Sequence, residues 1–157
     1  MKRISRIVFI ILLCFNLWGC KSTEDTKKIG TCTILVECST IFDNLEQLDA
    51  SVKEFVPESG IILGEKEVDI LEGDSVYDIL KRELKKEKIL MEASFTGKSA
   101  YVEGIDNIYE FSCGELSGWM YCVNREYPGK SCSDYEVKDG DVIEWHYTCD
   151  LGEDLKN

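Results

Sequence analysis

The chain has 157 residues and a formal net charge of −12, because 30 acidic residues stand against 18 lysines and arginines. Such a surface repels phosphate backbones and anionic lipid headgroups, which argues against a nucleic acid partner and against membrane binding through a basic patch. The length is that of one ordinary domain.

The first 19 residues have the pattern of an export signal. Lys2, Arg3 and Arg6 occur without any acid, and an apolar run from Ile7 to Phe15 follows them. This run is shorter than the roughly 20 apolar residues that a membrane-spanning helix needs. Shortly after this run comes the motif Leu-Trp-Gly-Cys20, which resembles the lipobox of bacterial lipoproteins, although a tryptophan is unusual at the second position of a lipobox.

We therefore expect a lipoprotein signal peptide over residues 1–19, a lipidated Cys20 carrying palmitate-type chains, a flexible tether over 20–31 and a domain over 32–157. An uncleaved anchor and plain secretion are the alternatives. Removing the first 19 of the 157 residues leaves 138, with 15 basic and 30 acidic residues and a net charge of −15. The expected location is the outer face of the cytoplasmic membrane.

Besides Cys14 of the signal and the lipidated Cys20, six cysteines remain, and an even number in an exported chain predicts up to three disulfides: Cys32, Cys38, Cys113, Cys122, Cys132 and Cys149. None forms a C-x-x-C pair, which argues against a zinc ribbon or a thioredoxin-like motif. The first two would lie about 20 Å apart on one strand, whereas a bridge needs Cα atoms within about 7 Å, so each should bond elsewhere. Buried free thiols are the alternative.

The first half of the domain combines strands with helical patterns. Residues 33–36 alternate as a strand, and apolar residues then recur at helical spacing over 41–52, which predicts an inserted helix before Pro57. Residues 61–72 are expected to be extended. Ser75 begins the best-defined helix, with a capping box to Asp78. We expect the charged run at its end, residues 83–88, to be solvated.

The second half is predicted to consist of strands and turns. Alternating or extended segments occupy 91–95, 101–105, 108–113, 119–123 and 142–149, with turns at 106–107, 124–125 and 137–141. A strand, a helix and then mostly antiparallel strands indicate the α+β class.

Three segments carry a family resemblance: Gly118-Trp-Met-Tyr-x-Val-Asn124, Ser133-Asp-Tyr-x-x-Lys-Asp-Gly-Asp-x-Ile-Glu-Trp145 and Gly73-Asp-Ser-Val-Tyr-Asp-Ile-Leu80. Together they resemble the transcobalamin-like C-terminal domain family, which is common in surface lipoproteins of Gram-positive bacteria. The resemblance spans about residues 32–155. It implies a β-grasp-like fold, a mostly antiparallel sheet curled around one main helix. The chain departs from the pattern at Asn124-Arg125, where Asn-Gly is usual, and at Cys122.

The resemblance also suggests cobalamin or another corrinoid as a ligand. The animal carriers use a large helical domain for most of their grip, and this chain has no such domain. For aromatic and polar contacts we select the segments 115–121 and 124–128 and, as tentative ligand-binding residues, Trp119, Tyr121, Asn124, Tyr127, Asp134 and Tyr135.

No catalytic constellation or metal site is expected. His146 is the single histidine, and we interpret it as a structural residue on the polar face of the last strand. The acids of 134–144 do not have the spacing of an EF-hand loop. The sequence thus predicts a non-enzymatic, lipid-anchored binding module that captures a small ligand. The alternative is a structural or adhesive cell-surface domain that binds a protein partner.

Overall fold

The structure, a computed structural model, describes residues 27–156. It is a mixed α/β fold with two sheets, a four-stranded sheet in the order β2-β1-β7-β6 and a three-stranded sheet in the order β3-β4-β5. The elements are β1 Lys28–Glu37, η2 Ser39–Asn44, η3 Lys53–Phe55, β2 Ile61–Leu71, α2 Val76–Glu87, β3 Met91–Thr96, β4 Ser99–Ile105, β5 Ile108–Tyr109, β6 Gly118–Val123, β7 Val142–Thr148 and η4 Glu153–Leu155. The expected signal peptide and Cys20 lie outside the described residues.

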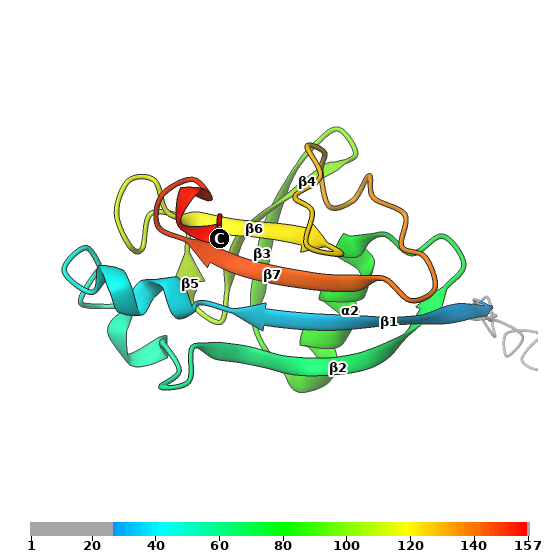
Figure 1. The fold of residues 1–157 in the computed structure, drawn as a ribbon, viewed down its shortest axis with the longest axis horizontal. Coiled ribbons are helices and arrows are strands. Elements are labelled where there is room, and N and C mark those ends of the chain that lie inside the picture. The colour runs from blue at the N-terminus through cyan, green and yellow to red at the C-terminus, as the bar shows by residue number, and fades with distance from the viewer. Residues whose placement is uncertain (1–26, 157) are drawn as a thin grey trace, which may run out of the picture.

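The four-stranded sheet forms one layer, and α2 packs behind it (Figure 1). β1 pairs antiparallel with β2 and parallel with β7, which pairs antiparallel with β6. Side chains alternate across each strand, so Ile34 and Val36 of β1 and Ile143 and Trp145 of β7 are buried on the inner face. Strand β1 begins at Lys28, earlier than the sequence pattern indicated, and so includes part of the expected tether over residues 20–31.

The helix α2 follows from its sequence signals. Ser75 accepts from the backbone N–H of Asp78, the Asp78 carboxylate accepts from the backbone N–H of Ser75, and both halves of the capping box are therefore present. Its apolar stripe packs into the core. The expectation of a fully solvated charged end is wrong at Glu83, whose side chain is only 2% exposed and pairs with Lys66 and Lys86.

The inserted segment after β1 differs from the predicted α-helix. It consists of two short 3-10 turns, η2 and η3, and the predicted apolar stripe is divided, with Ile41 buried and Leu45 52% exposed. No side chain caps η2 at Cys38, and Asp49 instead accepts the backbone N–H of Ser51 in a local turn. Local side-chain hydrogen bonds of this kind compete with a continuous helix.

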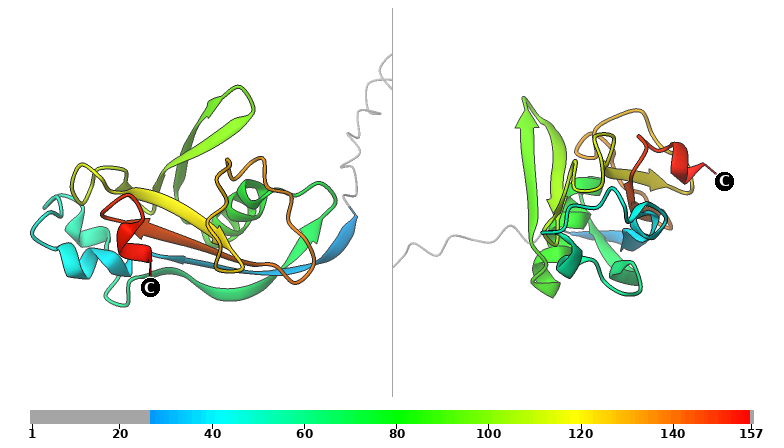
Figure 2. Two further views of the ribbon diagram at one scale, coloured as in Figure 1. Left: turned by 45° about the horizontal axis from the view of Figure 1, so that its top comes forward. Right: turned by 90° about the vertical axis from the view of Figure 1, so that its left-hand side faces the viewer.

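The three-stranded sheet stands at an angle to the main sheet, with the β3-β4 hairpin projecting from it (Figure 2). Two predicted turns are confirmed: Asp106-Asn107 joins β4 to β5, and Asn124-Arg125 follows β6, all four residues having positive φ. The predicted extended segment 108–113 is strand only over Ile108–Tyr109. No helix among residues 27–156 has the length and apolar character to cross a membrane.

All six cysteines of the described chain are buried free thiols, so the structure contains none of the expected disulfides. Cys32 and Cys38 lie on the inner face of β1 and its continuation, where they pack in the core. Cys113 and Cys149 lie close enough together that each thiol affects the pKa of the other, while their hydrogen bonds go to the carbonyl of Asn44 and the hydroxyl of Thr40 respectively. The alternative of buried thiols therefore describes this structure.

Candidate functional site

Polar side chains gather on the outer face of the four-stranded sheet, opposite α2. Glu144 and His146 lie two residues apart on β7 and so project to the same side. Cys122 of β6 stands opposite Glu144 in the antiparallel register, and Glu37 of β1 stands beside His146 in the parallel register. Three neighbouring strands thus place four chemically active groups on one face.

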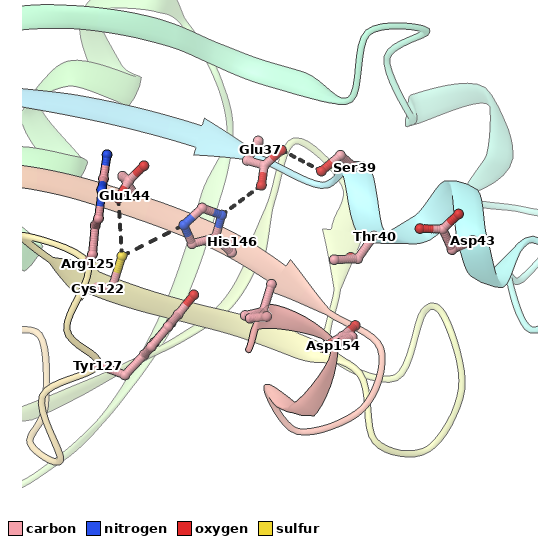
Figure 3. Close-up of a pocket in the computed structure, with 11 residues that line it drawn as sticks. Glu37, Ser39, Thr40, Asp43, Cys122, Arg125, Tyr127, Glu144, His146 and Asp154 are labelled. Carbon is pink, nitrogen blue, oxygen red and sulfur yellow. Dashed lines mark hydrogen bonds and ion pairs between the residues drawn. The ribbon is translucent and has the colours of Figure 1, made fainter. Parts of the chain in front are cut away.

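These four residues form a connected chain of contacts, which Figure 3 shows. The Cys122 thiol donates to Oε2 of Glu144 at 3.4 Å, and its Sγ lies 3.8 Å from Nε2 of His146. On the other side of the ring, Nδ1 of His146 lies 2.7 Å from Oε1 of Glu37. Glu37 also accepts from the hydroxyl of Ser39 at 2.5 Å. Both ring nitrogens of the histidine therefore face a partner.

This cluster lines an open pocket of about 700 Å³, here called the outer-face pocket; its other lining residues are Ser39, Thr40, Asp43, Arg125, Tyr127, Asp154 and Leu155. Burial is the main cause that raises the pKa of the Cys122 thiol to about 12, and the nearby charge of Glu144 acts in the same direction. The hydrogen bond with His146 lowers the pKa of Glu37, although burial opposes that shift. Burial likewise raises the pKa of Tyr127 to about 12.

Two kinds of chemistry fit a Cys, a His and carboxylates at these distances. A thiol nucleophile would need to be a thiolate, yet burial and Glu144 keep the Cys122 proton in place. Of the two groups beside the thiol, Glu144 at 3.4 Å is nearer than the histidine at 3.8 Å. The second kind is coordination, because Cys122, Glu144 and His146 present ligand atoms within 4.8 Å of one another. The three donor atoms therefore fit coordination, in which a bound metal ion displaces the thiol proton.

Sequence reasoning did not find this cluster. The pattern Glu144-x-His146 correctly places two polar residues on one strand face, and His146 does lie there. The neighbours Cys122 and Glu37 come from strands 22 and 107 or more residues away along the chain, and their pairing depends on strand order and register. The departure at Cys122 from the family pattern was the one available signal.

The aromatic residues selected from sequence lie elsewhere. Trp119 and Tyr121 are 6% and 9% exposed, and each is held by a side-chain hydrogen bond to a backbone carbonyl, of Ile108 and Lys130 respectively. Trp119 packs edge-on against Tyr147. These two side chains belong mainly to the core, and only their edges reach a cavity.

That cavity, here called the aromatic cleft, has a volume of about 200 Å³ between β4, β6 and the loop after β6; its lining residues are Ala100, Tyr101, Val102, Trp119, Met120, Tyr121, Tyr127, Pro128, Lys130, Ser131, Cys132 and Trp145. Three of the predicted contact residues therefore meet here. Tyr127 is 38% exposed and borders both the aromatic cleft and the outer-face pocket.

The remaining three selected residues have structural partners. Asn124 binds the carboxylate of Asp141 and accepts from the backbone of Val142, which holds the turn after β6. Asp134 accepts from the hydroxyl of Ser99. Tyr135 packs edge-on against Tyr121, outside the residues that line the aromatic cleft. The structure does not bring these three together with Trp119.

Comparison with known families and structures gives three results. Residues 73–149 match a family described as a domain of unknown function, DUF4430. The crystal structure of haptocorrin in complex with Cbi is similar over 83% of this chain and 28% of the haptocorrin chain, with a TM-score of 0.53 and 11% identity. A candidate metal-binding protein from Ruminococcus gnavus ATCC 29149 is similar over 76% of this chain and 97% of its own, with a TM-score of 0.45 and 13% identity.

No curated protein sequence matches the chain. The likeness to haptocorrin, at this level of identity, concerns the fold of a part of that protein. The chain corresponds to little more than a quarter of haptocorrin's length. The expected family resemblance is thus matched by haptocorrin in fold alone, and the match to DUF4430 lies in the part of the chain that contains α2 and the strands β3 to β7.

Proposed function

We propose that this protein is a lipid-anchored extracytoplasmic binding module whose aromatic cleft contacts a small ligand of the corrinoid class. The observation that carries the proposal is the aromatic cleft itself, in which Trp119, Tyr121 and Tyr127 border one cavity beside β6. Aromatic side chains offer rigid apolar area with a polar tip, which suits a flat ligand. A haptocorrin-like fold supports the same ligand class.

The sheet arrangement supports a β-grasp-like interpretation of the fold. β1 lies between β2 and β7, the pairing with β7 is parallel, and the described chain has a single α-helix that follows β2. In this proposal the β3-β4 hairpin and the loop after β6 border the ligand. A cavity of about 200 Å³ holds only an edge of a large ring system. We therefore expect weaker binding than a carrier with two domains achieves.

Titration calorimetry tests the ligand. The full-length protein in detergent is titrated with cobalamin and with cobinamide, and saturable one-to-one binding tighter than about 10 μM, near −7 kcal/mol, supports the proposal. Tyr127→Ala should weaken binding because this ring is exposed at the cleft, whereas Phe111→Ala, an exposed aromatic outside the cleft, should not. Flat titrations with both corrinoids would reject the ligand class.

The anchor has a separate test. The short apolar run and Cys20 support lipidation, since several acyl chains hold a protein firmly where one holds it marginally. In a Gram-positive host, wild type should fractionate with membranes and be released by detergent, and Cys20→Ser should lose acylation. Wild type in the cytosol would contradict the proposed location.

Export also bears on the thiols. We propose that Cys113 and Cys149 are the pair joined in an oxidising compartment, because their thiols already lie together. Intact-mass measurement after alkylation in denaturant should then show four free thiols among the six of the domain, and six after reduction. Six free thiols before reduction would mean that the exported domain keeps them all reduced.

A second candidate function is supported by exposed apolar side chains at the η2 end of the sheet. Leu45, Leu116 and Leu151 are 52%, 46% and 68% exposed, and the backbone N–H of Leu151 donates to the carbonyl of Leu116. Such side chains suit a structural or adhesive domain with a protein partner. Leu116→Lys together with Leu151→Lys should then abolish surface adhesion while leaving the corrinoid titration unchanged.

A further inference from the structure

We propose that Cys122, Glu144 and His146 form a binding site for a divalent transition metal ion, zinc in the first instance, and that Glu37 positions the histidine. The site is independent of the corrinoid proposal, because its ligand atoms lie on the outer face of the sheet. Its evidence is the distances, the donor types and the pocket that adjoins them.

The distances match a tetrahedral ion. With a Zn–S bond of about 2.3 Å and Zn–N and Zn–O bonds of about 2.0–2.1 Å, tetrahedral angles place the sulfur about 3.5–3.6 Å from the nitrogen and the oxygen. In the structure Sγ of Cys122 lies 3.4 Å from Oε2 of Glu144 and 3.8 Å from Nε2 of His146. The ligand atoms of Glu144 and His146 also lie within 4.8 Å of each other, so rotation of these side chains can place one ion within bonding distance of all three.

The donor set selects the class of ion. A sulfur, an imidazole nitrogen and a carboxylate oxygen together suit zinc and its first-row neighbours. Calcium and magnesium prefer oxygen ligands throughout, so this site should discriminate against them. Folding has already brought the backbones of the ligand residues together, because β6 and β7 are paired in register at these residues. Metal binding therefore needs only a small further loss of conformational entropy.

Glu37 supplies the second layer of the site. Metal-binding histidines usually donate their other ring N–H to a carboxylate or carbonyl, which fixes the tautomer and aims the free nitrogen at the ion. Nδ1 of His146 lies 2.7 Å from Glu37, and Nε2 is the nitrogen that faces Cys122. Ser39 in turn donates to Glu37 and holds the carboxylate in place. This arrangement has the form of a carboxylate–histidine–metal unit.

The surroundings favour a cation and leave room for a further ligand. Four carboxylates and one guanidinium line the outer-face pocket, from Glu37, Asp43, Glu144, Asp154 and Arg125. Cys122 is 2% exposed, and the pocket that it lines together with Glu144 and His146 is open. Three protein ligands with an open position are typical of zinc sites that bind water or an exogenous ligand. When the ion binds, the Cys122 proton leaves to solvent and the thiolate bonds to the metal.

Cobalt(II) provides the probe, because its visible spectrum reports both tetrahedral geometry and thiolate bonding. The reduced full-length protein in detergent, kept reduced by a phosphine, is titrated with Co²⁺, and zinc is then added in competition. We expect one ion per chain, a thiolate-to-cobalt charge-transfer band, displacement by zinc, and proton release seen as a buffer-dependent binding enthalpy. Excess calcium or magnesium should not displace the cobalt.

Variants assign the ligands. Cys122→Ser should remove the charge-transfer band. Cys122→Ser, Glu144→Gln and His146→Gln should each lower the cobalt affinity by more than the 10- to 100-fold that loss of an outer partner typically causes. Glu67→Gln, an exposed carboxylate on β2 of the same sheet, is the matched control and should leave the affinity unchanged. Circular dichroism confirms that each variant is folded.

Glu37 has its own signature as a positioning residue. Glu37→Gln should weaken cobalt binding by roughly 10- to 100-fold while the charge-transfer band remains, and Glu37→Asp should restore part of the affinity. Two results would overturn the proposal: a wild-type protein that binds cobalt no better than Cys122→Ser, or a charge-transfer band that persists in Cys122→Ser, which would place the ion on another thiol.

Discussion

The two faces of the four-stranded sheet are built from the same strands and follow different rules. On the inner face the side chains of β1 and β7 are apolar and almost fully buried, from Ile34 and Val36 to Ile143 and Trp145. On the outer face the alternate residues of the same strands include Glu37, Glu144 and His146, which are partly buried; Glu37 contacts His146, and Glu144 accepts from Cys122 of β6. Successive residues of one strand therefore belong alternately to the core and to the face that carries the candidate site.

The difference shows where the fold and the function of this protein are encoded. Inner-face residues are determined by volume and hydrophobicity, which any comparable apolar residue can approximate. The outer face holds a thiol, an imidazole and two carboxylates that contact one another through polar atoms at specific distances. Partly buried polar groups cost free energy to desolvate, so an arrangement of this kind points to a role in binding.

The largest expected effect comes from the inner face. Trp145→Ala should lower the free energy of unfolding by about 3–5 kcal/mol, because a large buried aromatic side chain leaves a cavity. Its neighbour on the other face, His146→Ala, should cost only about 1 kcal/mol. Urea denaturation at neutral pH measures both. Similar losses for the two variants would mean that the outer face also stabilises the fold.

Trp145→Phe refines this measurement. The Nε1 of Trp145 is the buried side-chain nitrogen that has no hydrogen-bond partner among the described residues. Phenylalanine removes that unpaired donor while keeping much of the apolar contact, so the variant should be clearly more stable than Trp145→Ala. A Phe variant as unstable as the Ala variant would show that the smaller ring recovers none of the packing of the indole and that the unpaired donor has no measurable cost.

The sequence allowed the inner face to be predicted and the outer cluster to be missed, for physical reasons. Period-two alternation identified β7 and its buried residues, and the capping box at Ser75 identified α2, because both signals are local. The approach of Cys122 to His146 depends on which strands pair and in what register. The prediction of a helix over residues 41–52 was wrong because local hydrogen bonds, as at Asp49, outweighed the helical spacing of the apolar residues.

Substitution of Glu83 should give the next largest effect, and it tests a buried charge on the helix that packs against the inner face. This carboxylate lies on α2 with 2% exposure, and burial raises its pKa, but hydrogen bonds from Lys86 and Lys66 outweigh that and leave it lowered. Glu83→Gln should cost about 1–2 kcal/mol at neutral pH, since the stranded lysines can still reach water. Thermal unfolding measures the loss, and Glu65→Gln, an exposed carboxylate on β2, is the control.

Glu37 gives a smaller, pH-dependent effect on the outer face. Its pKa is lowered in the folded protein, so its contribution is complete above its unfolded pKa of about 4.3 and is lost as the pH falls through the folded pKa. Glu37→Gln should therefore cost about 1 kcal/mol at pH near 7 and progressively less below about pH 4. Denaturation of both proteins across that range measures the gap, which should not be constant.

The smallest effect lies in the turn that borders the outer-face pocket. Asn124 and Arg125 both have positive φ, 54° and 67°, in the two-residue connection after β6. A left-handed conformation costs a residue with a Cβ about 1–2 kcal/mol, and glycine removes that cost while losing some backbone entropy.

Arg125→Gly should therefore raise the free energy of unfolding by about 0.5–1 kcal/mol, as measured by urea denaturation. Arg82, whose ion pair helps to hold α2, is left unchanged in this variant. Arg125 also lines the outer-face pocket. A gain in stability accompanied by a changed cobalt affinity would mean that the strained arginine is retained for the pocket and that the outer face is maintained at the expense of stability. If stability does not rise, contacts of the arginine side chain must offset the strain, and the turn would belong with the inner face as a feature of the fold.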